Sequence, residues 1–164
     1  MARSKASNTF KFKSSCPADT ARLAGLLSAA LKGGDALFLE GPIGAGKTFF
    51  VRELAAALGV KKLPVSASFN LMRAYKGRLK IYHFDLFRAG EADMENIGLD
   101  EYLGREDGVT AVEWPGEGGE MFAGTEPLRI EFKLAGGDRR EIAMEAGGDF
   151  HARLRAIEEK WRKK

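Results

Sequence analysis

A glycine-rich segment is the part of this sequence whose residue types and spacing point most directly to chemistry. Residues 41–48 read GPIGAGKT and match the pattern G-x-x-x-x-G-K-[ST]. Glycines let backbone amides approach and wrap phosphate oxygens, and a helix that begins at this point adds its positive end. Lys47 would reach the β- and γ-phosphates of a nucleotide, and the Thr48 hydroxyl would hold Mg²⁺. The segment therefore predicts a site for ATP and Mg²⁺.

Two acidic residues are candidates to complete the metal shell. A P-loop enzyme needs a carboxylate at the end of a nearby strand, because Mg²⁺ prefers oxygen ligands. Asp85 ends the apolar run 79–85, and Glu113 ends the apolar run 108–113. An acid at a strand end is more often a solvated surface group. With a P-loop in the chain, we expect at least one of the two to be functional.

The elements on either side of the glycine-rich segment are those that a P-loop requires. Residues 35–40 form a compact apolar run next to glycines, which predicts a buried strand. From Lys47 onward, apolar residues recur at helical spacing until Gly59, which predicts a helix. We expect nucleotide contacts from this strand, loop and helix at Gly41, Gly44, Ala45, Gly46, Lys47, Thr48 and Phe49.

The rest of the chain supplies enough strands and helices for one α/β domain. Alternating runs predict a hairpin across Gly77 and a second hairpin, 128–134 with 139–145, in the C-terminal third. We expect a three-layer P-loop NTPase fold with a mixed, mainly parallel central sheet. It would be a single domain over residues 1–164, with residues 1–8 loose and a basic tail at residues 160–164.

Composition limits the classes of protein to consider. A chain of 164 residues with 45% apolar residues is the size of one globular domain. Its formal charge of +3 is well short of the dense basic stripes that coat nucleic acid, so a role with RNA is permitted but not demanded. Only one cysteine is present, and there is no secretory signal core and no apolar run of the roughly 18 residues that span a bilayer. We therefore expect a cytoplasmic protein with no membrane partner.

Taken together, the motifs resemble one family, TsaE (also called YjeE), the small ATPase subunit of bacterial tRNA threonylcarbamoyladenosine synthesis. The string HFDLFR at residues 83–88, followed by Glu113-Trp114, is far more specific than a P-loop alone. The matching segments occur in the family's order at residues 41–48, 66–69, 83–88, 97–102 and 112–115.

The resemblance implies roles for individual residues. Thr48 and Glu113 would be the Mg²⁺ ligands, and Asp85 would be a second acid near the metal or the attacking water. With Lys47, the two acids would form the catalytic set. Trp114 would be a functional aromatic residue beside the site.

A switch loop is also implied, and the sequence departs from the family within it. Ser66 and Ser68 would belong to this loop, where the family usually reads S-P-T-[FY] and this chain reads SASF at residues 66–69. The proline is lost, but the hydroxyl is kept, so its role can persist. Pro42, where the family commonly has an acidic residue, fixes φ at a position whose amide is not indispensable.

The resemblance also implies a biological role. Family members bind and hydrolyse ATP, with Mg²⁺ as cofactor, in a complex with the subunits TsaB and TsaD. Hydrolysis supports repeated threonylcarbamoyl transfer to the adenosine next to the anticodon of tRNA. We expect weak activity from the subunit alone and only indirect contact with tRNA.

Several alternatives stay open at the level of the sequence. A small-molecule P-loop kinase shares the N-terminal half of this order of elements. Such kinases usually cover the phosphates with an arginine-rich lid, for which Arg105 is the best candidate here. An adaptor that binds ATP without hydrolysing it is another. His83 on an apolar strand favours a packed side chain over a catalytic base. The basic C-terminal residues favour a solvated helix end over an RNA contact.

Overall fold

A computed structural model describes residues 9–62, 71–90, 93, 96–116 and 122–163. The segment 1–8, predicted to be loose, lies outside the described residues, and so do Ser66 and Ser68 of the predicted switch loop. The strands are β1 (Thr9–Ser14), β2 (Ala36–Glu40), β3 (Met72–Lys76), β4 (Lys80–Asp85), β5 (Gly108–Glu113), β6 (Leu128–Leu134) and β7 (Arg140–Glu145). The helices are α1 (Pro17–Ala30), α2 (Lys47–Ala57), the short 3-10 helix η1 (Leu99–Glu101) and α4 (Gly148–Arg162).

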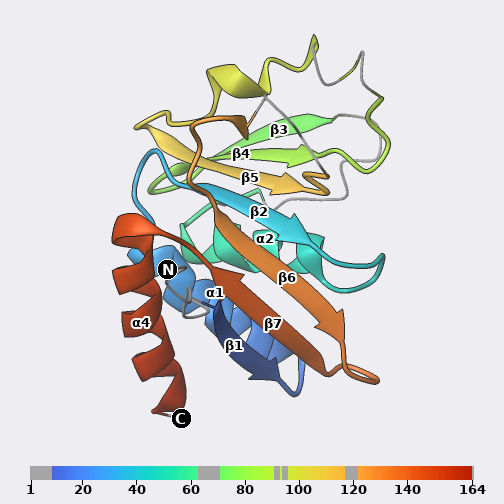
Figure 1. Ribbon diagram of the computed structural model, residues 1–164, viewed down its shortest axis with the longest axis vertical. Coiled ribbons are helices and arrows are strands. Elements are labelled where there is room, and N and C mark those ends of the chain that lie inside the picture. Colours follow the sequence, from blue (N-terminus) through green and yellow to red (C-terminus); the bar gives the residue numbers. More distant parts are fainter. Residues whose placement is uncertain (1–8, 63–70, 91–92, 94–95, 117–121, 164) are drawn as a thin grey trace, which may run out of the picture.

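One mixed sheet of seven strands, in the order β1-β7-β6-β2-β5-β4-β3, forms the centre of the molecule (Figure 1). The four central strands β6, β2, β5 and β4 run parallel to one another. Antiparallel pairs lie at both edges, where β3 joins β4, and β7 joins β6 and β1. The predicted mixed sheet and both predicted hairpins are confirmed.

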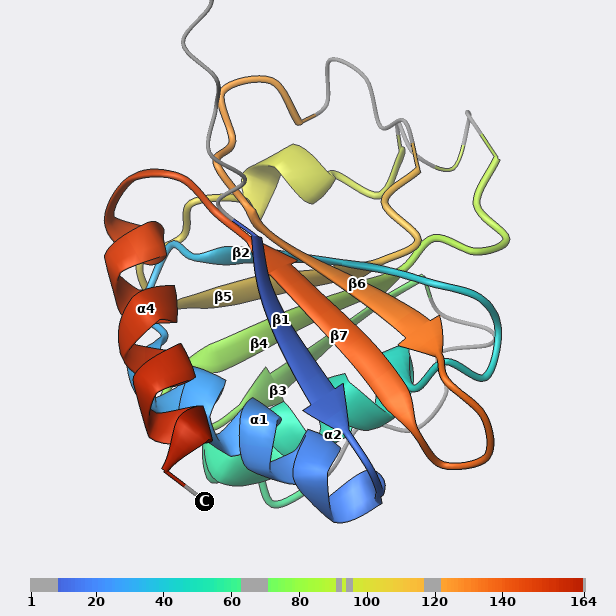
Figure 2. The same cartoon turned by 60° about the horizontal axis from the view of Figure 1, so that its bottom comes forward.

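Helices α1, α2 and α4 cover one face of the sheet, and η1 with its neighbouring loops lies on the other (Figure 1, Figure 2). The helical layer buries the main core, in which α1 and α2 pack against the sheet through residues such as Leu27 and Leu54. On the other face a smaller cluster around Phe38 and Phe84 packs against Leu99 of η1. The third layer of the predicted fold is therefore thin.

The strands β5 and β6 differ in how far other parts of the chain cover their two faces. Every residue of β5 is buried, as expected for a central strand covered on both faces. In β6, Leu128, Ile130 and Phe132 are buried while Arg129 and Glu131 between them are exposed. The face of β6 away from the helices is therefore open to solvent.

The C-terminal helix is fixed to the domain by its basic residues as well as by its apolar face. Phe150, Leu154 and Ile157 of α4 are buried. Arg153 forms a salt bridge with Asp35, with 2.6 Å between Nη1 and Oδ2. The helix continues to Arg162, so most of the predicted tail is helical. Among the described residues, no helix is both long and apolar enough to cross a membrane.

Candidate nucleotide site

The glycine-rich segment joins β2 to α2 and needs glycine at two positions for different reasons. At Gly41, a Cβ atom would lie 2.6 Å from the carbonyl oxygen of Phe132, so only glycine fits beside β6. Gly46, at the start of α2, has φ 102°, in the left-handed region that side chains disfavour. The loop therefore turns from strand to helix as the motif predicts.

Lys47 lies folded into the mouth of this loop and is only 5% exposed. Its Nζ donates hydrogen bonds to the carbonyl oxygens of Gly41, at 2.6 Å, and Pro42, at 3.0 Å. The ammonium also lies 4.0 Å from the centre of the Trp114 ring. Burial lowers the pKa of Lys47, while the nearby carboxylates of Glu113 and Asp85 act in the opposite direction. A buried cation held mainly by neutral groups is well placed to receive a phosphate.

Thr48, Glu113 and His83 form a chain of hydrogen bonds behind Lys47. The Thr48 hydroxyl donates to Glu113, with Oγ1 lying 2.9 Å from Oε1 and 3.0 Å from Oε2. His83 Nε2 lies 2.8 Å from Glu113 Oε1, and both side chains are almost fully buried. His83 is packed, as predicted, but it also fixes the orientation of the Glu113 carboxylate.

Asp85 is the neighbour of Glu113 across the sheet. The register of the parallel strands β4 and β5 sets these two residues opposite each other. Asp85 is partly exposed, and its Oδ1 accepts a hydrogen bond from the amide of Phe87 at 3.2 Å. Both predicted acids therefore lie at the same edge of the sheet as the P-loop.

The donor atoms at this edge fit Mg²⁺. They are the hydroxyl of Thr48 and the carboxylates of Glu113 and Asp85, all oxygens. The described residues contain no cluster of three or more His, Cys, Asp or Glu side chains that could hold a metal without help. Mg²⁺ in proteins is usually held by one or two carboxylates together with substrate phosphates. The arrangement is thus a site that a nucleotide would complete.

Trp114 closes one side of the site in an unusual backbone conformation. It is the only described non-glycine residue with positive φ, at 56°. Such conformations cost about 1–3 kcal/mol and cluster at functional sites. The strained turn after β5 directs the indole against Lys47 and against Phe87, whose ring centre lies 4.8 Å away.

These residues surround a pocket of about 410 Å³. Of the residues predicted to bind the nucleotide or metal, it is lined by Gly44, Gly46, Lys47, Thr48, Phe49, Asp85, Glu113 and Trp114. Two others lie in the loop without lining it: the Gly41 carbonyl contacts Lys47, and Ala45 is fully buried. Sequence reasoning did not assign Ile43, Phe87 and Arg88, which also line the pocket. Phe87 and Arg88 belong to the motif string at residues 83–88, so a signal for them existed.

Arg140 of β7 is a further residue that the sequence did not indicate. Its Nε donates to the carbonyl oxygen of Ala45 at 3.1 Å, and Nη2 donates to that of Gly44 at 3.2 Å. On the other side, Nη1 donates to the Gly137 carbonyl at 2.7 Å. The guanidinium thus ties the glycine-rich loop to the turn between β6 and β7.

Replacing Arg140 with alanine should weaken nucleotide binding about 10-fold, which corresponds to about 1.4 kcal/mol. The reason is that the loop would lose its preformed orientation and would have to be ordered by the ligand. Isothermal titration with Mg-ATP measures the effect. The matched control is Arg139→Ala, which removes the same charge from an exposed side chain whose described hydrogen bond lies within its own turn. Equal affinities for the two variants would contradict the assigned role.

Comparison with known proteins gives consistent matches. The family described as "Threonylcarbamoyl adenosine biosynthesis protein TsaE" matches residues 14–142. The tRNA threonylcarbamoyladenosine biosynthesis protein TsaE of Bacillus subtilis is 39% identical over 145 residues, which are 88% of this chain and 90% of the relative. The protein of the same name from Treponema pallidum is 35% identical over 77% of this chain and 93% of its own length. The crystal structure of Bacillus subtilis YdiB superposes with a TM-score of 0.75 at 36% identity, covering 93% of this chain and 95% of that one.

Proposed function

Because this chain belongs to the TsaE family of tRNA threonylcarbamoyladenosine biosynthesis proteins, we propose that it is the ATPase of that pathway. It binds ATP with Mg²⁺ in the pocket at the carboxyl ends of β2, β4 and β5 and hydrolyses it. It acts together with the subunits TsaB and TsaD. Threonylcarbamoyl transfer to tRNA is carried out by those partners and not by this chain.

One observation carries the proposal: the Thr48 hydroxyl lies within 3.0 Å of both Glu113 oxygens, although 65 residues separate the two in the sequence. A hydroxyl from the P-loop helix and an acid from the end of a neighbouring strand are the two protein ligands that P-loop enzymes give to Mg²⁺. Their contact beside Lys47 supports a hydrolytic nucleotide site over a tight turn with an exposed lysine.

The chain's own residues account for binding and for charge stabilisation. Amides of the loop and Lys47 would offset charge on the β- and γ-phosphates. Thr48 and Glu113 would hold Mg²⁺, which when bound neutralises charge developing on the phosphate oxygens. Asp85 is the more exposed of the two acids and lies one strand further out, where it can orient the attacking water.

The kinase alternative is weakened by the position of its candidate lid. Arg105 precedes β5, whose opposite end carries Glu113, so the strand places the two about 20 Å apart. Arg105 is also engaged locally, since Nε and Nη2 each lie 3.2 Å from an oxygen of Asp107. An arginine held at the far edge of the sheet does not cover phosphates bound at the P-loop.

The test is to follow the γ-phosphate of labelled ATP in the complex reconstituted with TsaB and TsaD. We expect release of free phosphate, faster than from the lone subunit, because partner surfaces help to close a switch. Label on a nucleoside or nucleotide acceptor would favour the kinase. Equal rates with and without the partners would argue against a role for the complex in hydrolysis. If the complex assembled equally with ATP and a non-hydrolysable analogue, and released no phosphate, the adaptor alternative would stand.

A further inference from the structure

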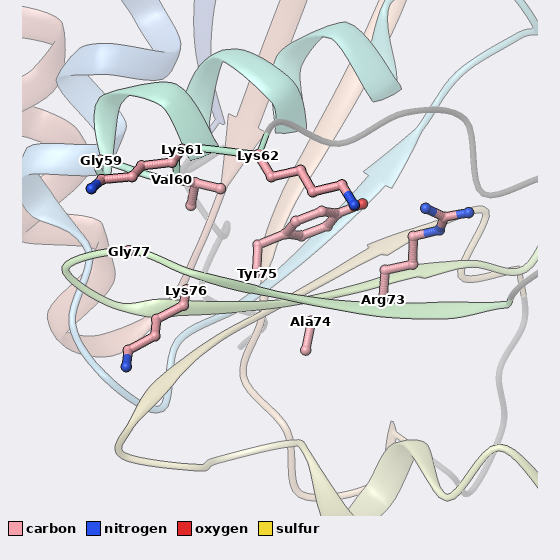
Figure 3. A pocket seen from close by; sticks show the side chains of 9 residues that line it. All are labelled: Gly59, Val60, Lys61, Lys62, Arg73, Ala74, Tyr75, Lys76 and Gly77. Carbon is pink, nitrogen blue, oxygen red and sulfur yellow. The ribbon is translucent and has the colours of Figure 1, made fainter.

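A second hollow, larger than the nucleotide pocket, lies at the opposite end of α2. It has a volume of about 800 Å³ and is formed by the segment that follows α2 and by the edge strand β3 (Figure 3). Its described lining residues are Gly59, Val60, Lys61, Lys62, Arg73, Ala74, Tyr75, Lys76 and Gly77. An α-helix rises 1.5 Å per residue, so the 11 residues of α2 place this hollow about 16 Å from Lys47. It is therefore separate from the nucleotide site.

The hollow is lined by positive charge. Lys61, Lys62, Arg73 and Lys76 contribute four cationic side chains, and the described lining contains no carboxylate. We call this surface, with Tyr75 at its centre, the basic groove. None of the four cations forms a salt bridge with a described residue, whereas Arg153 and Arg162 of α4 are both paired. Unneutralised cations around one hollow indicate an anionic partner.

The floor of the basic groove combines charge with an aromatic hydrogen-bond donor. Arg73 and Tyr75 are two residues apart on β3, so their side chains leave the same face of the strand. Figure 3 shows Lys62 extending to that side as well, while Lys61 and Lys76 point outward. Burial raises the pKa of Tyr75, although the neighbouring Arg73 acts in the opposite direction. The phenol therefore stays protonated and can donate a hydrogen bond.

We propose that the basic groove binds the phosphodiester backbone of RNA. Lys62 and Arg73 contact phosphates beside Tyr75, which faces a sugar or base, and Lys61 and Lys76, which point outward, contact phosphates at the rim. Lysines are suited to phosphates as point charges and an arginine fork can bind one bidentately. Aromatic side chains among basic ones are typical of surfaces that bind single-stranded nucleic acid. The family to which the chain belongs acts in tRNA modification, which makes tRNA the natural source of such a backbone.

This inference goes beyond the proposed ATPase function and does not depend on it. It differs from the expectation, drawn from the sequence, that contact with tRNA is only indirect. An acidic surface of a partner protein is the competing occupant. It is less favoured because four cations that line a groove without interspersed acids match a repeating phosphate chain better than the mixed charges usual at protein interfaces.

The experiment measures binding of a fluorescently labelled, unmodified tRNA transcript to the purified full chain at a series of salt concentrations. The groove variant is Lys61→Ala/Lys62→Ala/Lys76→Ala. The control is Lys11→Ala/Lys13→Ala/Lys133→Ala, which removes three exposed positive charges from β1 and β6. We expect the groove variant to bind at least about 10-fold more weakly and to lose about 3 from the slope of log K against log salt, about one for each lost phosphate contact.

The control should stay within about 2-fold of the wild type, because it changes only the diffuse charge of the protein and removes no phosphate contact. Mg-ATP affinity, measured in parallel, should be unchanged in both variants, which separates failure of the groove from misfolding. A single exposed substitution, Lys62→Glu, should also reduce tRNA affinity, and it provides a second variant with the core untouched. Equal losses in groove and control variants would overturn the proposal. The proposal would also be overturned if none of the substitutions changed the affinity for tRNA, or if the wild-type groove bound polyglutamate and not tRNA.

The result of the tRNA-binding experiment is independent of whether the chain hydrolyses ATP. If phosphate release were never observed but tRNA affinity fell in the groove variants only, the proposed ATPase function would fail and the RNA site would stand. If ATP hydrolysis were observed and the wild-type chain bound no tRNA at low salt, the reverse would hold.

Discussion

Replacing Lys47 with alanine should abolish nucleotide binding, with a loss of at least about 100-fold in affinity for Mg-ATP. The ammonium would reach both the β- and γ-phosphates, and charged hydrogen bonds contribute about 1.5–3 kcal/mol each, so two of them correspond to about 3–6 kcal/mol. The residue is 5% exposed, and its ammonium donates hydrogen bonds to carbonyl oxygens of the loop. Phosphate oxygens bound in the loop can replace these carbonyl oxygens as acceptors. Isothermal titration or a fluorescent ATP analogue would measure the loss.

The control for this substitution is Lys13→Ala, which removes an exposed lysine from β1. It should leave both affinity and thermal stability unchanged. The fold of the Lys47 variant should also survive, because alanine is a good helix former at the start of α2. Wild-type affinity in a folded Lys47→Ala protein would show that the pocket does not bind phosphate as proposed.

Replacing Glu113 should reduce turnover more than binding. We expect ATP hydrolysis in the complex with TsaB and TsaD to fall about 100- to 1000-fold, the range found when one preorganised group that stabilises the transition state is removed. Affinity for ATP should change much less, because Lys47 and the loop amides still hold the phosphates. Steady-state phosphate release together with a binding isotherm separates the two effects.

Both alanine and glutamine are needed at this position, because Glu113 is buried against His83. Glu113→Ala leaves the His83 ring without its partner and can lower stability, since an unsatisfied buried group costs about 1–3 kcal/mol. Glu113→Gln keeps the shape and a hydrogen bond but removes the charge that would hold Mg²⁺. Glu131→Ala, at an exposed position of β6, is the control. Unchanged hydrolysis in both Glu113 variants would remove this residue from the mechanism.

Asp85→Ala should also reduce turnover more than ATP binding, and it should lower stability less than Glu113→Ala does. Its side chain is partly exposed and its described hydrogen bond is to the amide of Phe87. If Asp85→Ala lowers turnover while Glu113→Gln lowers Mg²⁺ dependence, the two acids divide the roles of water orientation and metal binding. This comparison decides between the two acids without a bound ligand.

Local patterns were sufficient to predict the parts of the site that are continuous in the chain. A continuous apolar run predicted β2, and apolar residues of period 3.6 or two predicted α2 and the strands of both hairpins, because these periods follow from backbone geometry alone. The glycines and Lys47 could be assigned because a phosphate-binding loop needs special φ values and close backbone approach at fixed positions. Asp85 and Glu113 could be singled out as acids that end apolar runs, whereas resemblance to a family gave Glu113 its role as a metal ligand and added Trp114.

Contacts between distant segments depend instead on strand order, which local patterns do not contain. The register of β4 against β5 sets Asp85 beside Glu113, and the parallel pairing of β2 with β5 brings Glu113 to Thr48. Arg140 reaches Ala45 from 95 residues away, because β7 and its turn lie next to the P-loop once the C-terminal hairpin joins the sheet. The basic groove likewise exists only because the end of α2 packs beside the edge strand β3. The sequence thus predicts a nucleotide site, while the packing of the sheet decides which side chains surround that site and where the basic groove lies.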